Sequence, residues 1–373
     1  MDSTFEKPPR PLTIGGRTIS SVGRTRIYVC GVTPYDVTHL GHAATFVWTD
    51  AAVRVLRAAG TTVELARNVT DVDETLLAEA RRRGERYDWL AATQRFAFER
   101  TMTALGVPHP DHEPTARRTV SQVVQLAQAL LDRDAAYVRG GTVYARTSAA
   151  ATRAGVDEAT ALRLSEEYGD EPGDPAKEHP LDTAVWRGAN EGEPQWPSPW
   201  GGGRPGWHAQ CAAMVLGTYG ASIDLHAGGA DLAFPHHATE AHLAETVTGV
   251  SPFARAWLRP GTVRLGVDKM AKSTGNLVLV DDLLKEHSAG VLRMLCLNRP
   301  WRESWTFTVD GLEAAAGQLT DLYAAAGRLD GESGVDAVDE ALLTELDVPR
   351  ALAVALDTGG AAARRLIDVL QLQ

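Results

Sequence analysis

Two short segments of the chain carry side chains that suit phosphate binding. The first is an HLGH motif with His39 and His42, placed where a predicted strand leads into a predicted helix. A helix N-terminus presents N–H groups and positive potential to a phosphate, and imidazoles can donate further hydrogen bonds. The second is a KMAKS motif, in which Lys269 and Lys272 place two ammonium groups in a polar loop suited to a triphosphate. Either motif alone also fits an ordinary surface turn, and their joint occurrence favours nucleotide chemistry.

A second group of residues has the donor atoms of a zinc site. Cys30 and Cys211 offer thiolates, His236 an imidazole and Glu240 a carboxylate. The spacing of four between His236 and Glu240 places both on one face of a helix. The ligands are far apart in the sequence and no CxxC is present, so Cys30 also fits the role of a small core residue at the end of a buried strand.

A glycine-rich turn follows the predicted strand at 223–227. Backbone exposed at Gly228 and Gly229 can lie against a flat ring, and Asp231 offers an acceptor for a hydroxyl or an amine. The chain lacks both the GxxxxGK(S/T) loop and a GxGxxG motif after a strand, so P-loop and dinucleotide-binding functions lose their best support.

The elements that must position these residues are predicted from hydrophobic periodicity. Buried strands over 26–30 and 62–67, joined by a helix over 41–59, predict a parallel α/β sheet. A Trp-, Pro- and Gly-rich stretch over 181–207 predicts an ordered loop, and residues 149–180 look peripheral. Further predictions are helices over 74–83, 87–105, 116–132 and 239–248, a hairpin over 136–144, and a helical region from 289 to the end broken near 331–334.

Composition and charge narrow the class of protein. The 373 residues carry a formal net charge of −11, which argues against a partner held mainly by phosphate neutralisation. No apolar run has the length of a membrane span or the form of a signal peptide, so we expect a cytoplasmic enzyme without a membrane partner. Three cysteines do not make a disulfide framework. Lysine occurs only at positions 7, 177, 269, 272 and 285, which makes the paired lysines of KMAKS more significant.

Together these segments resemble the catalytic domain of class I aminoacyl-tRNA synthetases, in the cysteine branch. HLGH and KMAKS resemble the two signature motifs of that class, and YVCGVTPYD, NVTDVDE, EPQWPSPWGGGRPGWHAQCAAM and DLHAGGADLAFPHHATE are similar, in order and spacing, to blocks of cysteinyl-tRNA synthetase. GVTPYDVTHLGHAATF, EEYGDEPGDP and GNLVLV look closer to the ATP-dependent cysteine ligases of mycothiol biosynthesis. That family joins cysteine to the amine of glucosaminyl-inositol and lacks an anticodon-binding domain.

The resemblance implies an α/β fold of the class I synthetase type, a Rossmann-like parallel sheet with an inserted subdomain and a small helical C-terminal region. The boundaries it suggests are two catalytic halves over 1–115 and 181–265, a connective insertion over 116–180, a KMAKS region over 266–310 and a helical domain over 311–373.

The resemblance also implies roles for individual residues. It makes Cys30, Cys211, His236 and Glu240 the ligands of one Zn²⁺ per chain, and it places Mg²⁺ with ATP. His39, His42, Lys269, Lys272 and Asp231 take the catalytic roles. The residues it places around cysteine and the adenylate are Cys30, Gly31, Val32, Thr33, Thr45, Asn68, Val69, Thr70, Trp207, Gly229, Ala230, Asp231 and Val263.

Some positions depart from the family pattern and leave alternatives open. Gln210 stands where a glutamate is usual, Ala271 where a serine is common, and Glu240 follows the synthetase pattern. We expect a monomeric ligase that takes L-cysteine, ATP and a small amine acceptor, glucosaminyl-inositol, without tRNA. The alternatives are a paralogue that loads another small amine or a carrier protein, a truncated cysteinyl-tRNA synthetase, and an inactive binding or regulatory homologue.

Overall fold

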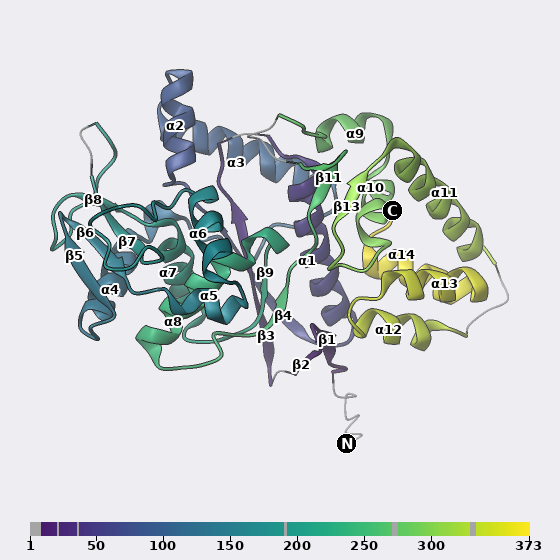
Figure 1. The fold of residues 1–373 in the computed structure, drawn as a ribbon. Coiled ribbons are helices and arrows are strands. Elements are labelled where there is room, and N and C mark those ends of the chain that lie inside the picture. Colours follow the sequence, from purple (N-terminus) through teal and green to yellow (C-terminus); the bar gives the residue numbers. More distant parts are fainter. Residues whose placement is uncertain (1–8, 21, 36, 190–191, 271–274, 329–332) are drawn as a thin grey trace.

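A central parallel sheet separates two unequal halves of the molecule. The computed structural model describes residues 9–20, 22–35, 37–189, 192–270, 275–328 and 333–373. Figure 1 shows the teal inserted region on one side of this sheet and the yellow-green C-terminal helices on the other. The strands run parallel in the order β10-β9-β3-β4, which confirms the predicted α/β class. Their bounds are β3 (Arg24–Val32), β4 (Thr62–Val69), β9 (Ile223–Ala227) and β10 (Ala254–Leu258).

Strand β3 divides its side chains between the two halves, because successive residues of a strand face opposite sides of the sheet. Ile27 and Val29 belong to the large core on the side of the first helix. Tyr28 and Cys30 belong to a smaller core on the other side. The helices that follow the first two strands are α1 (Leu40–Ala58), α2 (Glu74–Arg83) and α3 (Tyr87–Ala104).

The inserted region has an antiparallel sheet of its own, with strand order β5-β6-β7-β8. Strands β7 and β8 lie in the stretch predicted as an ordered loop, so that prediction is wrong for both segments. The predicted helix over 116–132 is a short turn, η1 (Ala116–Arg118), followed by α4 (Val120–Leu131). The other bounds are β5 (Ala136–Arg139), β6 (Thr142–Ala145), α5 (Ala149–Ala154), α6 (Glu158–Glu167), β7 (Thr183–Gly188) and β8 (Gly203–Pro205).

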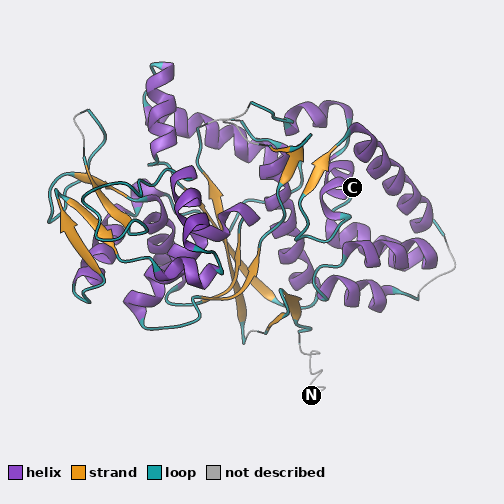
Figure 2. Cartoon of the chain, viewed as in Figure 1, coloured by secondary structure: helices purple, strands orange, loops and turns teal. Residues whose placement is uncertain are grey.

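This antiparallel sheet joins strands on both sides of residue 180. The predicted boundary between insertion and second catalytic half therefore falls between two paired strands, β6 and β7. We propose that the insertion ends after Pro205, where the chain enters α7. Figure 2 shows the orange strands of the two sheets as separate groups. Beyond the boundary lie α7 (Trp207–Tyr219), η2 (Ala230–Leu232), the π-turn η3 (Ala233–His237) and α8 (Ala238–Thr248).

Backbone hydrogen bonds anchor the described residues on either side of positions 271–274. The N–H of Met270 donates to the carbonyl of Val263, 2.9 Å away. The N–H of Leu40, at the start of α1, donates to the carbonyl of Val278, also at 2.9 Å. Ala271 and Lys272 lie outside the described residues. The elements here are β11 (Val263–Leu265), β12 (Asp268–Lys269), β13 (Trp305–Phe307), α9 (Val280–Glu286) and α10 (Ala289–Leu297), with sheet order β12-β11-β13.

The C-terminal helices pack against α1 rather than forming a separate core. One hydrophobic cluster extends from Leu12 to Leu372 and includes most of α1. At its centre the buried Arg293 guanidinium donates to Asp50 at 2.6 Å and to the carbonyl of Leu370 at 2.8 Å. The remaining elements are β1 (Leu12–Ile14), β2 (Arg17–Ile19), α11 (Val309–Ala326), α12 (Val335–Leu343), α13 (Val348–Thr358) and α14 (Gly360–Leu370). Among the described helices, none combines the length and the apolar character needed to span a membrane.

Candidate active site

Two thiols and one imidazole from three distant segments meet on the insertion side of the sheet. Cys30 comes from β3, Cys211 from α7 and His236 from η3, and one ligand atom of each lies within 4.8 Å of the others. All three side chains are buried. The structure therefore brings together three of the four residues predicted to bind zinc.

The donor set and its surroundings fit a zinc ion. Burial, followed by the hydrogen bond and charge of Cys211, raises the pKa of Cys30 well above the usual range. For His236, burial disfavours the charged imidazolium and lowers the pKa to about 3, so this imidazole is neutral. A divalent cation would stabilise the thiolates that burial disfavours. The Nδ1 atoms of His208 and His236 lie 2.8 Å apart, a contact that orients the His236 ring as outer partners of metal ligands do.

The fourth predicted ligand, Glu240, lies in a second set that shares Cys30. Its carboxylate accepts a hydrogen bond from Nε2 of His226 at 3.1 Å, and its Oε2 lies 4.0 Å from the Cys30 sulfur. Ligand atoms of Cys30, Glu240, His226 and His237 lie within 4.8 Å of one another. Zinc ligation by Glu240 therefore stays a prediction.

Sequence reasoning missed the two histidines of this second set. His226 lies on β9, in contact with Glu240. His237 lies beside the Gly-Gly turn, where a Cβ on Gly228 would come within 2.7 Å of its Nε2. The Nε of Arg259 donates to Nδ1 of His237 at 3.3 Å. His226 falls within the strand predicted over 223–227. Its alternation along that strand was the signal that could have placed it on the same face of the sheet as Cys30.

The carboxyl ends of β3 and β4 present the residues predicted to surround cysteine. The hydroxyls of Thr33 and Thr70 lie 2.7 Å apart. The side chain of Asn68 accepts from the N–H of Gly31 at 2.9 Å and donates to the sulfur of Cys211 at 3.5 Å. A Cβ at position 31 would lie 1.8 Å from the carbonyl oxygen of Asn68, so only glycine fits here. Val32 and Val69 are paired neighbours at the end of the same two strands.

Gln210 has a structural role that its sequence position did not reveal. Its side-chain nitrogen donates to the carbonyl of Val72 at 2.6 Å and to that of Pro205 at 3.2 Å, and the residue is fully buried. An amide can serve two carbonyl acceptors, whereas an ionised carboxylate cannot. The glutamine thus ties α7 to the loop after β4 and to the end of β8.

We therefore expect Gln210→Glu to lower the free energy of unfolding by about 1–3 kcal/mol near neutral pH, the usual cost of buried groups left without partners. Burial would raise the pKa of the new carboxyl, and its protonation would restore one donor, so the loss should shrink as the pH falls. Urea unfolding at two pH values measures it. Gln125→Glu, exposed on α4, is the control, and an equal loss in both variants would contradict the assignment.

Trp207, at the start of α7, lies against His236 of the predicted zinc set and near Tyr168, which lies beside Asp231 and Lys269. Its ring stacks on His236 with centroids 4.2 Å apart. The ring of Tyr168 also lies nearly parallel to it, with centroids 6.2 Å apart. The stretch that contains Tyr168 was expected to be peripheral, and that expectation is wrong because the end of α6 reaches this site. Trp196 and Trp200 instead pack against the core of the insertion.

The HLGH motif opens α1 as predicted. His39 is the N-cap residue, and no side chain caps the helix. The first turn of α1 also contains no acidic residue. The rings of His39 and His42 stack with centroids 3.8 Å apart. A Cβ on Gly41 would lie 3.0 Å from the His39 ring and 3.9 Å from Val263. The two predicted histidines and Val263 therefore share one corner of the site.

The turn after β9 completes that corner. A Cβ on Gly229 would meet Asp231 at 2.3 Å and the Thr45 hydroxyl at 3.8 Å. The N–H of Ala230 donates to the carbonyl of Pro260 at 2.9 Å. The Asp231 carboxylate lies 2.5 Å from the ammonium of Lys269. Burial opposes the charge of this ammonium, but Asp231 outweighs it and raises the pKa of Lys269. Lys272 lies outside the described residues.

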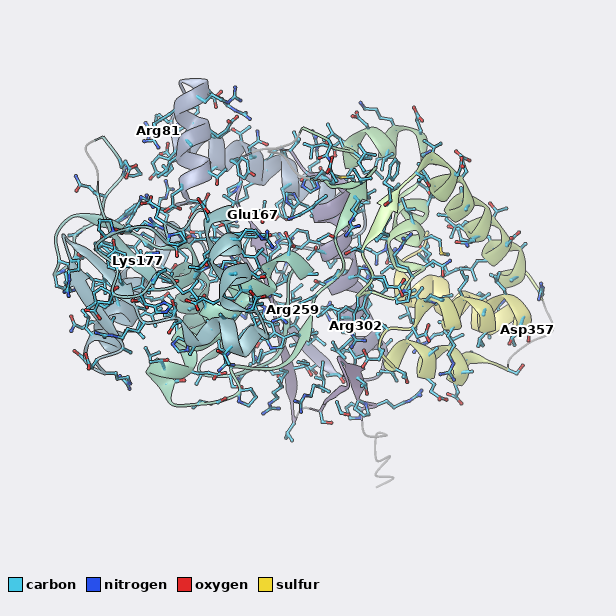
Figure 3. All side chains as sticks on the ribbon, in the orientation of Figure 1. Arg81, Glu167, Lys177, Arg259, Arg302 and Asp357 are labelled. Atoms are coloured by element: carbon cyan, nitrogen blue, oxygen red, sulfur yellow. The ribbon has the colours of Figure 1, made fainter. Side chains whose placement is uncertain are left out.

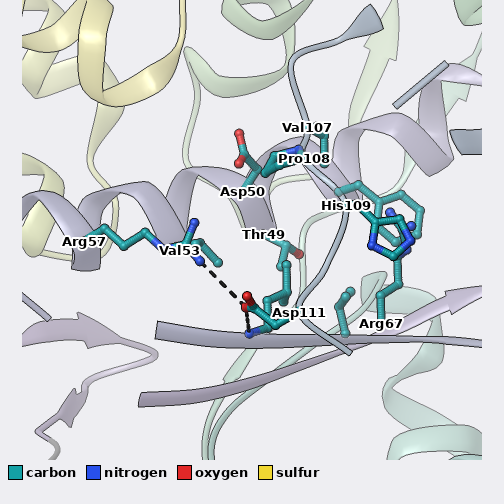
Figure 4. A pocket seen from close by; sticks show the side chains of 12 residues that line it. Thr49, Asp50, Val53, Arg57, Arg67, Val107, Pro108, His109 and Asp111 are labelled. Carbon is teal, nitrogen blue, oxygen red and sulfur yellow. Dashed lines mark hydrogen bonds and ion pairs between the residues drawn. The ribbon is translucent and has the colours of Figure 1, made fainter. Parts of the chain in front are cut away.

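A separate pocket lies on the opposite side of the sheet, against α1 (Figure 4). It is lined by Val29, Thr49, Arg57, His109 and Asp111, among others. Asp111 lies near Arg57 in this pocket and accepts from the N–H of Leu65 at 2.8 Å. Because Val29 and Cys30 point to opposite faces of β3, this pocket is not continuous with the thiols.

The sequence matches one protein family, tRNA synthetases class I (C) catalytic domain, over residues 18–317. It is 37% identical to an L-cysteine:1D-myo-inositol 2-amino-2-deoxy-alpha-D-glucopyranoside ligase of Streptosporangium roseum over 385 aligned positions, which cover 96% of this chain and 95% of that protein. It is 38% identical to a cysteine–tRNA ligase of Dehalococcoides mccartyi, over 83% of this chain and 67% of that protein.

The fold is similar to that of a solved synthetase. Mycobacterium tuberculosis methionyl-tRNA synthetase in complex with methionyl-adenylate superposes with a TM-score of 0.64, covering 94% of this chain and 82% of that one. The sequence identity is 16%, so this likeness concerns the fold, and it confirms the predicted synthetase-type architecture.

Proposed function

Since the chain belongs to the class I cysteinyl-tRNA synthetase family, in the branch of the cysteine ligases of mycothiol biosynthesis, we propose that it activates L-cysteine with ATP and transfers it to the amine of glucosaminyl-inositol. As a member of this family, the chain is an ATP-dependent ligase. The observation that carries the choice of amino acid is the set of two thiols and one imidazole formed by Cys30, Cys211 and His236. The rings of Trp207 and Tyr168 connect this set to the residues proposed to contact the nucleotide.

Cys30, Cys211 and His236 would hold one Zn²⁺, with Glu240 as a candidate fourth ligand. When bound, the ion would select cysteine, because a thiolate is a better zinc ligand than the hydroxyl of serine. The residues around it supply a fixed frame: Asn68 holds Cys211, and Trp207 covers His236. Such a frame allows the amino acid to be chosen at the binding step, without an editing reaction.

Activation needs no protein nucleophile. The carboxylate of cysteine attacks the α-phosphate of ATP, the bond to the β-phosphate oxygen breaks, and cysteinyl-adenylate and pyrophosphate form. Mg²⁺ accompanies the ATP. His39 and His42 donate to phosphate oxygens at the start of α1, and Lys269 with Lys272 balances charge on the triphosphate. Catalysis is then positioning combined with charge stabilisation.

Transfer forms the new C–N bond. The neutral amine attacks the carbonyl carbon of the mixed anhydride, AMP leaves, and the amine loses a proton. The curated relatives with the ligase name cover this chain almost from end to end, which supports a small amine acceptor. The net charge of −11 also disfavours an extended tRNA-binding surface.

The acceptor is tested by offering candidate acceptors separately. The purified enzyme with ATP and cysteine is incubated with glucosaminyl-inositol, with another small amine or with total tRNA, and products are followed by mass spectrometry. We expect the cysteinyl amide of glucosaminyl-inositol and AMP. Cysteinylated tRNA without amide would overturn the proposal. Amide from another amine alone would keep the chemistry and change the substrate. Absence of any cysteine-dependent pyrophosphate exchange would indicate an inactive homologue.

A further inference from the structure

Tyr168 is a residue of the insertion that reaches the nucleotide side of the site. It is the C-cap residue of α6, and Figure 3, in which the adjacent Glu167 is labelled, shows this end of the helix at the centre of the molecule. Its hydroxyl lies 3.4 Å from Oδ2 of Asp231, the same oxygen that accepts from Lys269 at 2.5 Å. The ammonium of Lys269 also lies 5.8 Å from the centre of the Tyr168 ring.

The same ring faces the amino-acid side. Its plane is inclined by only 11° to that of Trp207, and the Trp207 plane by 23° to that of His236. Three nearly parallel rings therefore connect the Asp231–Lys269 pair to a residue of the metal set. Offset stacking of aromatic rings is a favourable geometry, so each ring helps to hold its neighbour in place.

Helix α6 is a firm support for this ring. Ala161 on α6 packs with Phe234 and Ala238, which flank His236 in the sequence. Burial, then the charge of Asp231, raises the pKa of Tyr168 to about 12. The phenol is therefore protonated at neutral pH and can donate to the carboxylate, while Lys269 keeps its positive charge.

We propose that Tyr168 is a positioning residue for cysteine activation, because its hydroxyl orients Asp231 and Lys269 toward the nucleotide while its ring supports Trp207 over the amino acid. This inference rests on the proposed function. It separates two contributions of one side chain: the hydroxyl acts on ATP binding, and the ring acts on cysteine binding.

Two variants separate the contributions, with cysteine-dependent exchange of pyrophosphate into ATP as the assay. Tyr168→Phe should raise KM for ATP by about 3- to 10-fold, the scale of one ordinary hydrogen bond. Its KM for cysteine should change by less than about twofold, because the ring remains. Tyr168→Leu, which removes the ring as well, should raise both KM values.

Tyr144→Phe is the matched control. It also removes a tyrosine hydroxyl from the insertion, one that donates to Asp174 at 2.6 Å, but away from the site. It should leave both KM values unchanged. Thermal unfolding and zinc content of all three variants are measured alongside, and equal values exclude a general loss of folding.

The outcomes distinguish this inference from the proposed function. Wild-type protein without cysteine-dependent exchange would contradict the function itself. Normal wild-type exchange with an unchanged KM for ATP in Tyr168→Phe would overturn the role of the hydroxyl, and so would a lowered KM for ATP, which would mean that Tyr168 restrains Lys269 from the nucleotide. Equal shifts of both KM values in Tyr144→Phe would show that the effect comes from a general change in folding rather than from the site.

Discussion

His42→Ala is expected to slow cysteinyl-adenylate formation by roughly 10²-fold or more, the scale of losing one oriented donor to developing charge. His42 lies in the first turn of α1 and stacks on His39, so its removal takes away both the proposed phosphate donor and a support for its neighbour. Lys272→Ala should have an effect of similar size. The measurement is cysteine-dependent pyrophosphate exchange under saturating ATP and cysteine.

Matched substitutions outside the site control for general damage. His287→Ala removes an imidazole from the residue that ends α9. Lys285→Ala removes an exposed lysine that, like Lys269, pairs with an aspartate, here Asp282 at 2.7 Å. Both should retain normal exchange. Near-normal exchange in His42→Ala and Lys272→Ala would show that these motifs do not act on the triphosphate.

Cys211→Ala is expected to reduce zinc content far below one equivalent and to abolish measurable cysteine activation. Loss of a direct ligand should weaken zinc binding by more than the roughly 10- to 100-fold that outer-shell substitutions cost. The side chain is buried beside Asn68, and replacement leaves only Cys30 and His236 of this three-residue set. Metal analysis of purified protein and the exchange assay report the two effects independently.

The third cysteine provides the control for this experiment. Cys296 is also buried, but it lies in the core between α10 and α1, where burial raises its pKa to about 12. Cys296→Ala should lose some stability and keep its zinc and its activity. Full activity of the wild-type protein with well under one equivalent of zinc would show that the site does not use a zinc ion.

Local sequence patterns predicted three strands of the parallel sheet, β3, β4 and β9, and the helices α1 to α3, but they did not predict β10. The strand predicted over 223–227 is β9, and the helix predicted over 74–83 is α2, with the same bounds. Hydrophobic periodicity and glycine stops determine these elements, and neither depends on distant contacts. Strands β7 and β8 were missed because their pairing with the hairpin is non-local and their Trp, Pro and Gly content is typical of a loop.

The site was predictable where a motif carries the chemistry and unpredictable where the fold alone brings residues together. Cys30, Cys211 and His236 could be predicted from donor type and resemblance. Tyr168 could not, because nothing in the sequence around it indicates that α6 ends beside Asp231. Gln210 was interpreted through a missing carboxylate, whereas its role follows from two backbone carbonyls that only the fold places within reach.

The large core shared by the first and last parts of the chain bears on how such a protein can change over evolutionary time. The carbonyl of Thr13 accepts from the N–H of Glu345 at 2.9 Å, and Arg293 joins α10 to α1 and α14. Substitutions in the C-terminal helices must therefore be matched on α1, which opens with HLGH. The insertion has a core of its own and can vary more independently, which makes it the part of the molecule in which new acceptor preferences can arise without rebuilding the rest.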